Sequence, residues 1–142
     1  MLTTAFYLVA NWQTGAMRFA NAGHPRPLHL RRTAGGARAL VNSSGKSQAA
    51  LGLVEDTVYE GTDVKLAPKD LIMLFTDGLF EVQGDKNQFY SQELVFEAVQ
   101  RRLQLPAPQL FDEVLQEVRS FSTEGGFTDD VCLVGVELAG QG

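Results

Sequence analysis

The stretch Leu71-Ile72-Met73-Leu74-Phe75-Thr76-Asp77-Gly78 decides both the fold and the candidate site of this protein. Its first five residues form a continuous apolar run, short enough to be a strand covered on both faces. Pro68-Lys69-Asp70 predicts a turn into that strand. Directly after the strand comes the carboxylate of Asp77, and Gly78 lets another part of the chain approach closely. The sequence therefore predicts a central core strand with a candidate functional residue at its end.

The segment before this strand is predicted to be rich in β-structure. Runs of β-branched, aromatic and apolar residues, separated by turn-forming residues, are typical of short strands. Such runs occur at residues 4–12, 17–22, 27–30, 39–41 and 57–66. The first two flank Gln13-Thr14-Gly15 and predict a β-hairpin, and the third and fourth flank Gly35-Gly36. Residues 42–48 are polar and predict an exposed loop.

Two helices and a last strand are predicted after the core strand. Apolar residues recur at helical spacing over 94–103 and 110–121, with Ser91 as a candidate N-cap and Pro106-Ala107-Pro108 as the separator. Residues 131–138 predict a buried strand that pairs beside the core strand, with Cys132 in the core. A run of strands with segregated helices is typical of an α+β domain with layered antiparallel sheets. We interpret residues 1–142 as one such domain, or a piece of one.

Composition and charge exclude several classes of function. With 142 residues, 44% hydrophobic and 20% charged, the chain suits one core. A net charge of -5 disfavours nucleic-acid binding, which needs clustered Lys and Arg. No apolar run approaches the ~20 residues that cross a bilayer, and no signal-peptide pattern is present, so no membrane partner is expected. A single cysteine cannot form an intramolecular disulfide, and we expect a soluble, cytoplasmic protein.

Three carboxylates are the candidates for metal chemistry. Asp77 follows the core strand, and Asp129 and Asp130 precede the last strand, so pairing of the two strands would bring all three to one sheet edge. Oxygen ligands alone favour a hard cation such as Mg²⁺ or Mn²⁺ over zinc. An Asp before a Gly is also an ordinary turn, and an acidic pair before a strand is also an ordinary solvated loop. Spacing alone leaves both interpretations open.

Four motifs together resemble the SpoIIE-like branch of the PPM-type (type 2C) metal-dependent serine/threonine protein phosphatases. They are Asn21-Ala22-Gly23-His24-Pro25, Leu51-Gly52, Leu74-Phe75-Thr76-Asp77-Gly78 with Glu81, and Thr128-Asp129-Asp130-Val131-Cys132-Leu133. The resemblance covers nearly the whole chain and corresponds to the C-terminal two-thirds of such a domain. It implies a sandwich of two antiparallel sheets flanked by helices, with two Mn²⁺ or Mg²⁺ ions that activate a water at one end of the sheets.

The resemblance also implies roles for individual residues. Asp77 and Asp129 match metal ligands of the family, and would act in catalysis through the metal-activated water. Asp130, Gly78, His24 and Asn21 would lie beside the ligands, and Asn21 would shape a turn together with Gly23. For His24, a purely structural hydrogen-bonding role is the alternative. The substrates implied are phosphorylated regulatory proteins, such as anti-sigma-factor antagonists, with an upstream sensor or receiver domain in control.

One departure from the family pattern bears on activity. The family's N-terminal strand with its Asp-Gly-His-Gly element, and the helices after it, have no counterpart between Met1 and Gly142. We therefore expect this chain alone to be inactive or nearly so, to hold metal loosely, and to self-associate through uncovered sheet surface. A truncated or miscalled start at Met1 would explain this departure. A non-catalytic binding or regulatory module derived from the phosphatase fold, and a small β-rich scaffold with incidental acidic turns, are the alternatives.

Overall fold

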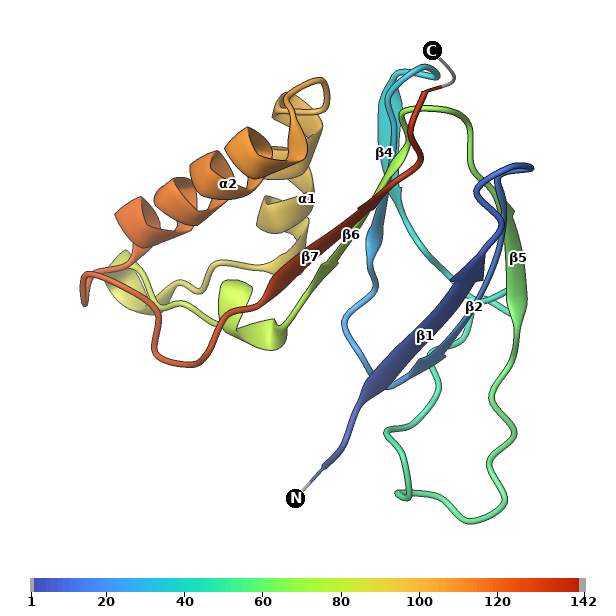
Figure 1. The fold of residues 1–142 in the computed structure, drawn as a ribbon. Helices are drawn as coiled ribbons and strands as arrows, with labels where there is room; N and C mark the ends of the chain where they lie inside the picture. The colour runs from blue at the N-terminus through green and yellow to red at the C-terminus, as the bar shows by residue number, and fades with distance from the viewer. Residues whose placement is uncertain (1, 141–142) are drawn as a thin grey trace.

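The structure, a computed structural model that describes residues 2–140, has three layers (Figure 1). Two antiparallel sheets face each other, and a pair of helices covers the far side of one of them. The strands are β1 (Ala5–Ala10), β2 (Ala16–Ala22), β3 (Leu28–Arg31), β4 (Gly36–Ala39), β5 (Thr62–Lys65), β6 (Leu71–Phe75) and β7 (Leu133–Glu137). The helices are α1 (Gln92–Arg101) and α2 (Ala107–Phe121), with short 3-10 turns η1 (Asp77–Leu79) and η2 (Asp85–Asn87). The predicted α+β sandwich is confirmed.

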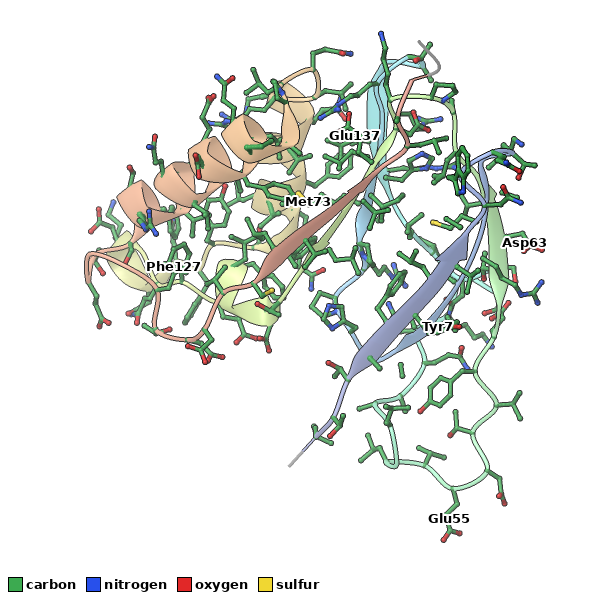
Figure 2. The ribbon with its side chains drawn as sticks, in the orientation of Figure 1. Tyr7, Glu55, Asp63, Met73, Phe127 and Glu137 are labelled. Atoms are coloured by element: carbon green, nitrogen blue, oxygen red, sulfur yellow. The ribbon has the colours of Figure 1, made fainter. Side chains whose placement is uncertain are left out.

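Strand β6 lies at the centre of the molecule, as the apolar run predicts. The sheet that contains it has the order β4-β3-β6-β7, and the other sheet has the order β1-β2-β5. Leu71, Ile72 and Met73 are each 0% exposed. Alternate residues of β6 belong to the two cores. Met73 lies in the cluster packed with the helices (Figure 2), and Ile72 lies in the cluster between the sheets. A strand covered on both faces needs apolar residues at every position, which explains the unbroken run.

The helix layer packs as its periodicity predicts. Ser91 caps α1 by accepting a hydrogen bond from the backbone N–H of Leu94 at 3.2 Å. Helix α2 fully buries Leu110, Val114 and Val118, one face of a helical repeat. The α2 side of β7 carries Gly135, where a Cβ atom would lie 3.1 Å from the Phe111 ring. This glycine lets α2 lie close to the sheet.

Residues 57–61 differ from the prediction, because only the second half of the expected 57–66 strand forms. Strand β5 pairs with β2, whereas the residues before it are held by side chains. Tyr59 donates from its hydroxyl to the carbonyl oxygens of Ala49 and Ala50 at 3.0 and 3.1 Å. Glu60 accepts from Ser43 and Ser44 in the preceding loop. These local bonds replace a strand ladder.

Two other expectations are corrected by the structure. The strand predicted at 39–41 forms at Gly36–Ala39 instead, because a tight turn closes at Gly35, whose φ is +86°. Cys132, expected in the core, is exposed, because it precedes β7. Strand β7 is itself partly exposed at the sheet edge, with Val134 48% exposed, although it pairs with β6 as predicted.

The outer face of the β1-β2-β5 sheet carries exposed apolar side chains. Tyr7 and Val9 of β1 are 68% and 55% exposed and line a shallow apolar depression, and Figure 2 shows Tyr7 on this sheet, away from the helices. This face gives the expected self-association a surface, and the association itself stays a prediction. No helix among residues 2–140 is long and apolar enough to span a membrane.

A buried histidine–aspartate pair, with the exposed Arg38 beside it, lies on the inner face of the β4-β3-β6-β7 sheet. His29 Nε2 lies 2.7 Å from Asp70 Oδ2, and the two side chains are 1% and 3% exposed. Arg38 donates from Nε to His29 Nδ1 at 3.4 Å, which identifies the imidazole as neutral with its proton on Nε2. Burial lowers the pKa of His29, and Arg38 and Arg31 add to this effect, while Asp70 opposes it.

This arrangement predicts a stability that falls in mild acid. Because the pKa of His29 is below 6.5 in the folded chain, the unfolded chain binds more protons below that pH. The contribution is therefore fully present above 6.5 and is lost as pH falls toward the folded pKa. We expect the free energy of unfolding, measured by urea titration from about pH 7.5 to about pH 5, to show a shallower slope in His29→Gln. The slope in His24→Gln is measured for comparison, because the pKa of His24 is also lowered. An unchanged slope in His29→Gln would contradict the assignment of the pH dependence to His29.

Candidate functional site

A cavity of about 570 Å³ opens at the end of β6, where the strand passes into η1. Five parts of the chain meet there: the residues before β1, the turn between β2 and β3, the loop at Ser47, the segment from Thr76 to Glu81, and the start of α1. The lining residues are Thr4, Gly23, His24, Pro25, Arg26, Ser47, Thr76, Asp77, Phe80, Glu81 and Gln92. The cavity therefore contains Asp77 and His24, two of the residues singled out from the sequence.

Asp77 presents an available carboxylate to this cavity. It begins η1 directly after the buried strand, and its backbone carbonyl accepts the N–H groups of Phe80 and Glu81, both at 3.1 Å. Its side chain is exposed and has no hydrogen-bond or ion-pair partner within residues 2–140. A fixed backbone with an unpaired carboxylate suits a ligand for a cation.

The turn after β2 places His24 beside Asp77. Asn21 holds this turn with both ends of its side-chain amide: its Oδ1 accepts from His24 N at 2.8 Å, and its Nδ2 donates to His24 O at 3.0 Å. Gly23 has a φ of +68°, and a Cβ atom there would lie 2.8 Å from the backbone N of Ala50. The expected turn-shaping role of Asn21 and Gly23 is thus seen in the structure.

The imidazole of His24 is half-buried near the end of β6. Its Nδ1 lies 3.3 Å from Thr4 Oγ1. Burial lowers the pKa of His24, and the Phe75 backbone carbonyl and the Asp77 carboxylate oppose that shift. His24 is therefore close enough to sense Asp77, while its hydrogen bonds tie together the N-terminus and the turn.

The segment before β7 joins the end of β6 through its backbone. Thr76 accepts a hydrogen bond on Oγ1 from Cys132 N at 3.0 Å, and its own N–H donates to Cys132 O at 3.2 Å. At Gly78, a Cβ atom would lie 2.3 Å from the carbonyl oxygen of Asp130, so only glycine fits. The close approach expected at Gly78 is made by this segment.

Asp129 and Asp130 are not among the residues that line the Asp77 cavity. Both residues line a different cavity of about 580 Å³, between α2 and the start of β7. Asp129 Oδ1 accepts a hydrogen bond from the backbone N–H of Asp130 at 2.7 Å, a local contact of the kind common in loops. Within the described residues, no three side chains of His, Cys, Asp and Glu gather closely enough to hold a metal ion. The pairing of β6 with β7 thus brings the two segments together, while their acidic residues line two different cavities.

Ligands for a metal ion are present as separate groups. Mn²⁺ and Mg²⁺ take carboxylate and carbonyl oxygens, and the Asp77 cavity offers the carboxylates of Asp77 and Glu81. Their chemistry fits a hard cation, but they are fewer than a closed site needs. The residues of this cavity would contribute part of a metal site.

Sequence reasoning missed two residues of the site, Arg26 and Ser47, and one residue of the core, His29. Arg26 and Ser47 line the Asp77 cavity and are joined by a hydrogen bond from Arg26 Nη2 to Ser47 Oγ at 3.1 Å. They come from segments 21 residues apart, so no local motif links them. The buried His29 could have been suspected, because it interrupts the apolar residues Leu28 and Leu30 of a predicted strand.

The fold is similar to that of several solved structures, among them domains described as PP2C or phosphatase domains. The chain is similar to the SiaA-PP2C domain of Pseudomonas aeruginosa, with a TM-score of 0.74 and 19% identity, over 93% of this chain and 50% of that one. It is similar to the RsbU and RsbW domains of Rv1364c from Mycobacterium tuberculosis, with a TM-score of 0.69 and 22% identity, over 98% of this chain and 37% of that one. It is also similar to the Mn-presoaked phosphatase domain of the cell fate determinant SpoIIE from Bacillus subtilis. Here the TM-score is 0.72 and the identity 17%, over 98% of this chain and 58% of that one.

The sequence comparisons identify the family. A family model described as Stage II sporulation protein E (SpoIIE) matches residues 1–139, and the chain belongs to this family. The family is one of serine/threonine protein phosphatases. Among curated proteins, the chain is 21% identical over 136 residues to Protein IcfG of Synechocystis sp.. The matched region covers 96% of this chain and 20% of IcfG. The chain thus spans one-fifth of that relative's length.

The close contact at Gly78 predicts that Gly78→Ala is destabilising. The added Cβ would meet backbone atoms of Asp130, so the segment before β7 must move. We expect a loss of about 1–3 kcal/mol in the free energy of unfolding, measured by urea denaturation. Gly126→Ala is the matched control in the same region, because nothing lies within 4 Å of a Cβ there. Equal stability of the two variants would show that the contact at Gly78 is absent in solution.

Proposed function

We propose that this chain forms part of a metal-dependent protein phosphatase domain that dephosphorylates phosphoserine or phosphothreonine on a bacterial regulatory protein. The observation that carries the proposal is the position of Asp77. Its unpaired carboxylate stands at the end of the central buried strand, beside a cavity, in a chain whose family match spans residues 1–139. Fold similarity to PP2C-type domains agrees with this assignment.

Asp77 and Asp129 are proposed as metal ligands of the complete domain. Two Mn²⁺ or Mg²⁺ ions would supply an activated water and offset the charge that develops on the phosphoryl oxygens. Thr76 and Gly78 hold the segment that carries Asp129 against the end of β6. The Asp129 carboxylate accepts its hydrogen bond from within the loop, so no bond to another element would have to break for it to bind a metal ion. Asp130 and His24 would position these groups without contacting the reacting atoms.

The substrate proposed is a phosphorylated regulatory protein such as an anti-sigma-factor antagonist, acting in the cytoplasm. The similarity to a structure that contains RsbU and RsbW domains supports this class. The chain matches only 20% of IcfG, which fits a phosphatase domain controlled by further domains such as a sensor or receiver. A phosphoprotein substrate and a controlling domain are therefore the partners that we propose.

A second candidate function is a non-catalytic module that binds a phosphoprotein or a partner domain. One observation favours it: within residues 2–140, the metal-ligating side chains do not form a group of three. A module of this kind would keep the cavity and would not bind Mn²⁺ at Asp77. Metal binding therefore separates the two candidates.

Mn²⁺ binding at Asp77 can be tested without an activity assay. Because Mn²⁺ is paramagnetic, we expect it to broaden the amide NMR signals of Asp77, Gly78 and His24 before those of other residues. Asp77→Asn should weaken this broadening on the order of tenfold or more, as for the loss of a metal ligand or its support. Asp85→Asn, the same change at an exposed carboxylate of η2, should leave it unchanged. Broadening centred elsewhere would exclude Asp77 as a ligand.

Phosphate release from a phosphoserine peptide in Mn²⁺ tests the reaction itself. With an incomplete ligand set, we expect little or no release by this chain alone, and any release should be abolished in Asp77→Asn. Release that is equal in Asp77→Asn would contradict the proposed mechanism. Absence of both release and Mn²⁺ binding would support the non-catalytic module.

A further inference from the structure

We propose that Arg26, oriented by Ser47, binds the phosphate of the substrate directly in the cavity beside Asp77. This inference rests on the proposed phosphatase function and names how the substrate would be held. Arg26 is the one Lys or Arg among the residues that line this cavity, where Asp77 and Glu81 supply negative charge. A site for a phosphoprotein needs a cation for the phosphate as well as ligands for metal ions.

The guanidinium of Arg26 keeps most of its donors available. It donates one hydrogen bond, from Nη2 to Ser47 Oγ. Other arginines are engaged differently: Arg18, Arg32 and Arg101 each pair with a carboxylate within 4.0 Å. In the part of the chain that the structure describes, Arg26 has no such pair, although two carboxylates share its cavity. An arginine held by a neutral hydroxyl retains its full charge for an incoming anion.

The backbone fixes Arg26 at the rim of the cavity. It stands between Pro25 and Pro27, which restrict the backbone on both sides, and only Pro27 separates it from the start of β3 at Leu28. The Asn21 amide fixes the preceding turn through His24, as described above. A guanidinium carried by such a segment binds a ligand with little further ordering of the backbone.

A second, smaller cavity extends the site on the side of Arg26. It has a volume of about 100 Å³ and shares Gly23, His24, Arg26 and Ser47 with the larger cavity. Its other lining residues are polar or basic: Asn21, Asn42, Lys46 and Gln48. No Asp or Glu lines it. The combined site thus has an acidic half around Asp77 and a basic half around Arg26, a layout that suits a phosphate next to metal ligands.

Titration of the chain with a phosphoserine peptide in Mg²⁺ tests this inference directly. We expect the peptide to shift the NMR signals of the Arg26 side-chain Nε–H and the Ser47 amide. Arg26→Gln should weaken binding by roughly tenfold or more, the effect of losing a charge-assisted hydrogen bond. Arg18→Gln is the control, because Arg18 is an exposed arginine of the β1-β2-β5 sheet, where it pairs with Asp63 of the same sheet. Thermal melting of each variant verifies that it is folded.

Two further arms separate the origins of the effect. The unphosphorylated peptide should cause no shift at Arg26, and inorganic phosphate should bind at the same signals more weakly than the phosphopeptide. Shifts from inorganic phosphate without any from the phosphopeptide would overturn the inference, as would equal binding by Arg26→Gln and the unsubstituted chain. Phosphopeptide binding at Arg26 without Mn²⁺ broadening at Asp77 would uphold this inference while contradicting the phosphatase proposal. Mn²⁺ broadening at Asp77 without peptide binding at Arg26 would do the opposite.

Discussion

The pairing of β6 with strands on both sides is the constraint on which the rest of the structure depends. Strand β6 bonds to β3 along one edge and to β7 along the other, and its first three residues are fully buried. A strand in this position cannot shift by one residue without turning its core side chains to the wrong layer. The register therefore fixes where β6 ends, and so where Asp77 emerges.

Side chains that replace backbone partners build the site at that end. The Asn21 amide closes the turn that carries His24, and the Thr76 hydroxyl links the end of β6 to the segment before β7. Each of these groups satisfies backbone atoms at a strand end, where no ladder partner is available. Gly23 and Gly78 permit the close approaches that go with these bonds. The cavity thus results from the side-chain hydrogen bonds that connect these loops.

The periodic features were predictable from sequence, and the long-range polar contacts were not. The run in β6, the hairpin of β1 and β2, and the stripes of α1 and α2 each follow from local burial patterns. Residues 57–61 alternate like a strand, but Tyr59 and Glu60 bond to residues about ten and seventeen positions earlier. The pairing of β6 with β7 was inferred correctly, but the paired residues of β7 begin at Leu133. Asp129 lies in the loop before them, where the strand register does not set its direction, and it lines a different cavity from Asp77.

The opposite charges of Asp77 and Arg26 share one cavity without pairing, and backbone rigidity accounts for this. Asp77 is fixed by the start of η1, and Arg26 by two prolines and the bond to Ser47. Were either segment flexible, the two side chains would gain from an ion pair in a partly buried site. Held apart, each charge faces solvent in the cavity and is free to bind a ligand that supplies the opposite charge. A phosphate ester accompanied by a divalent cation carries that pair of charges, the cation for Asp77 and the phosphate for Arg26.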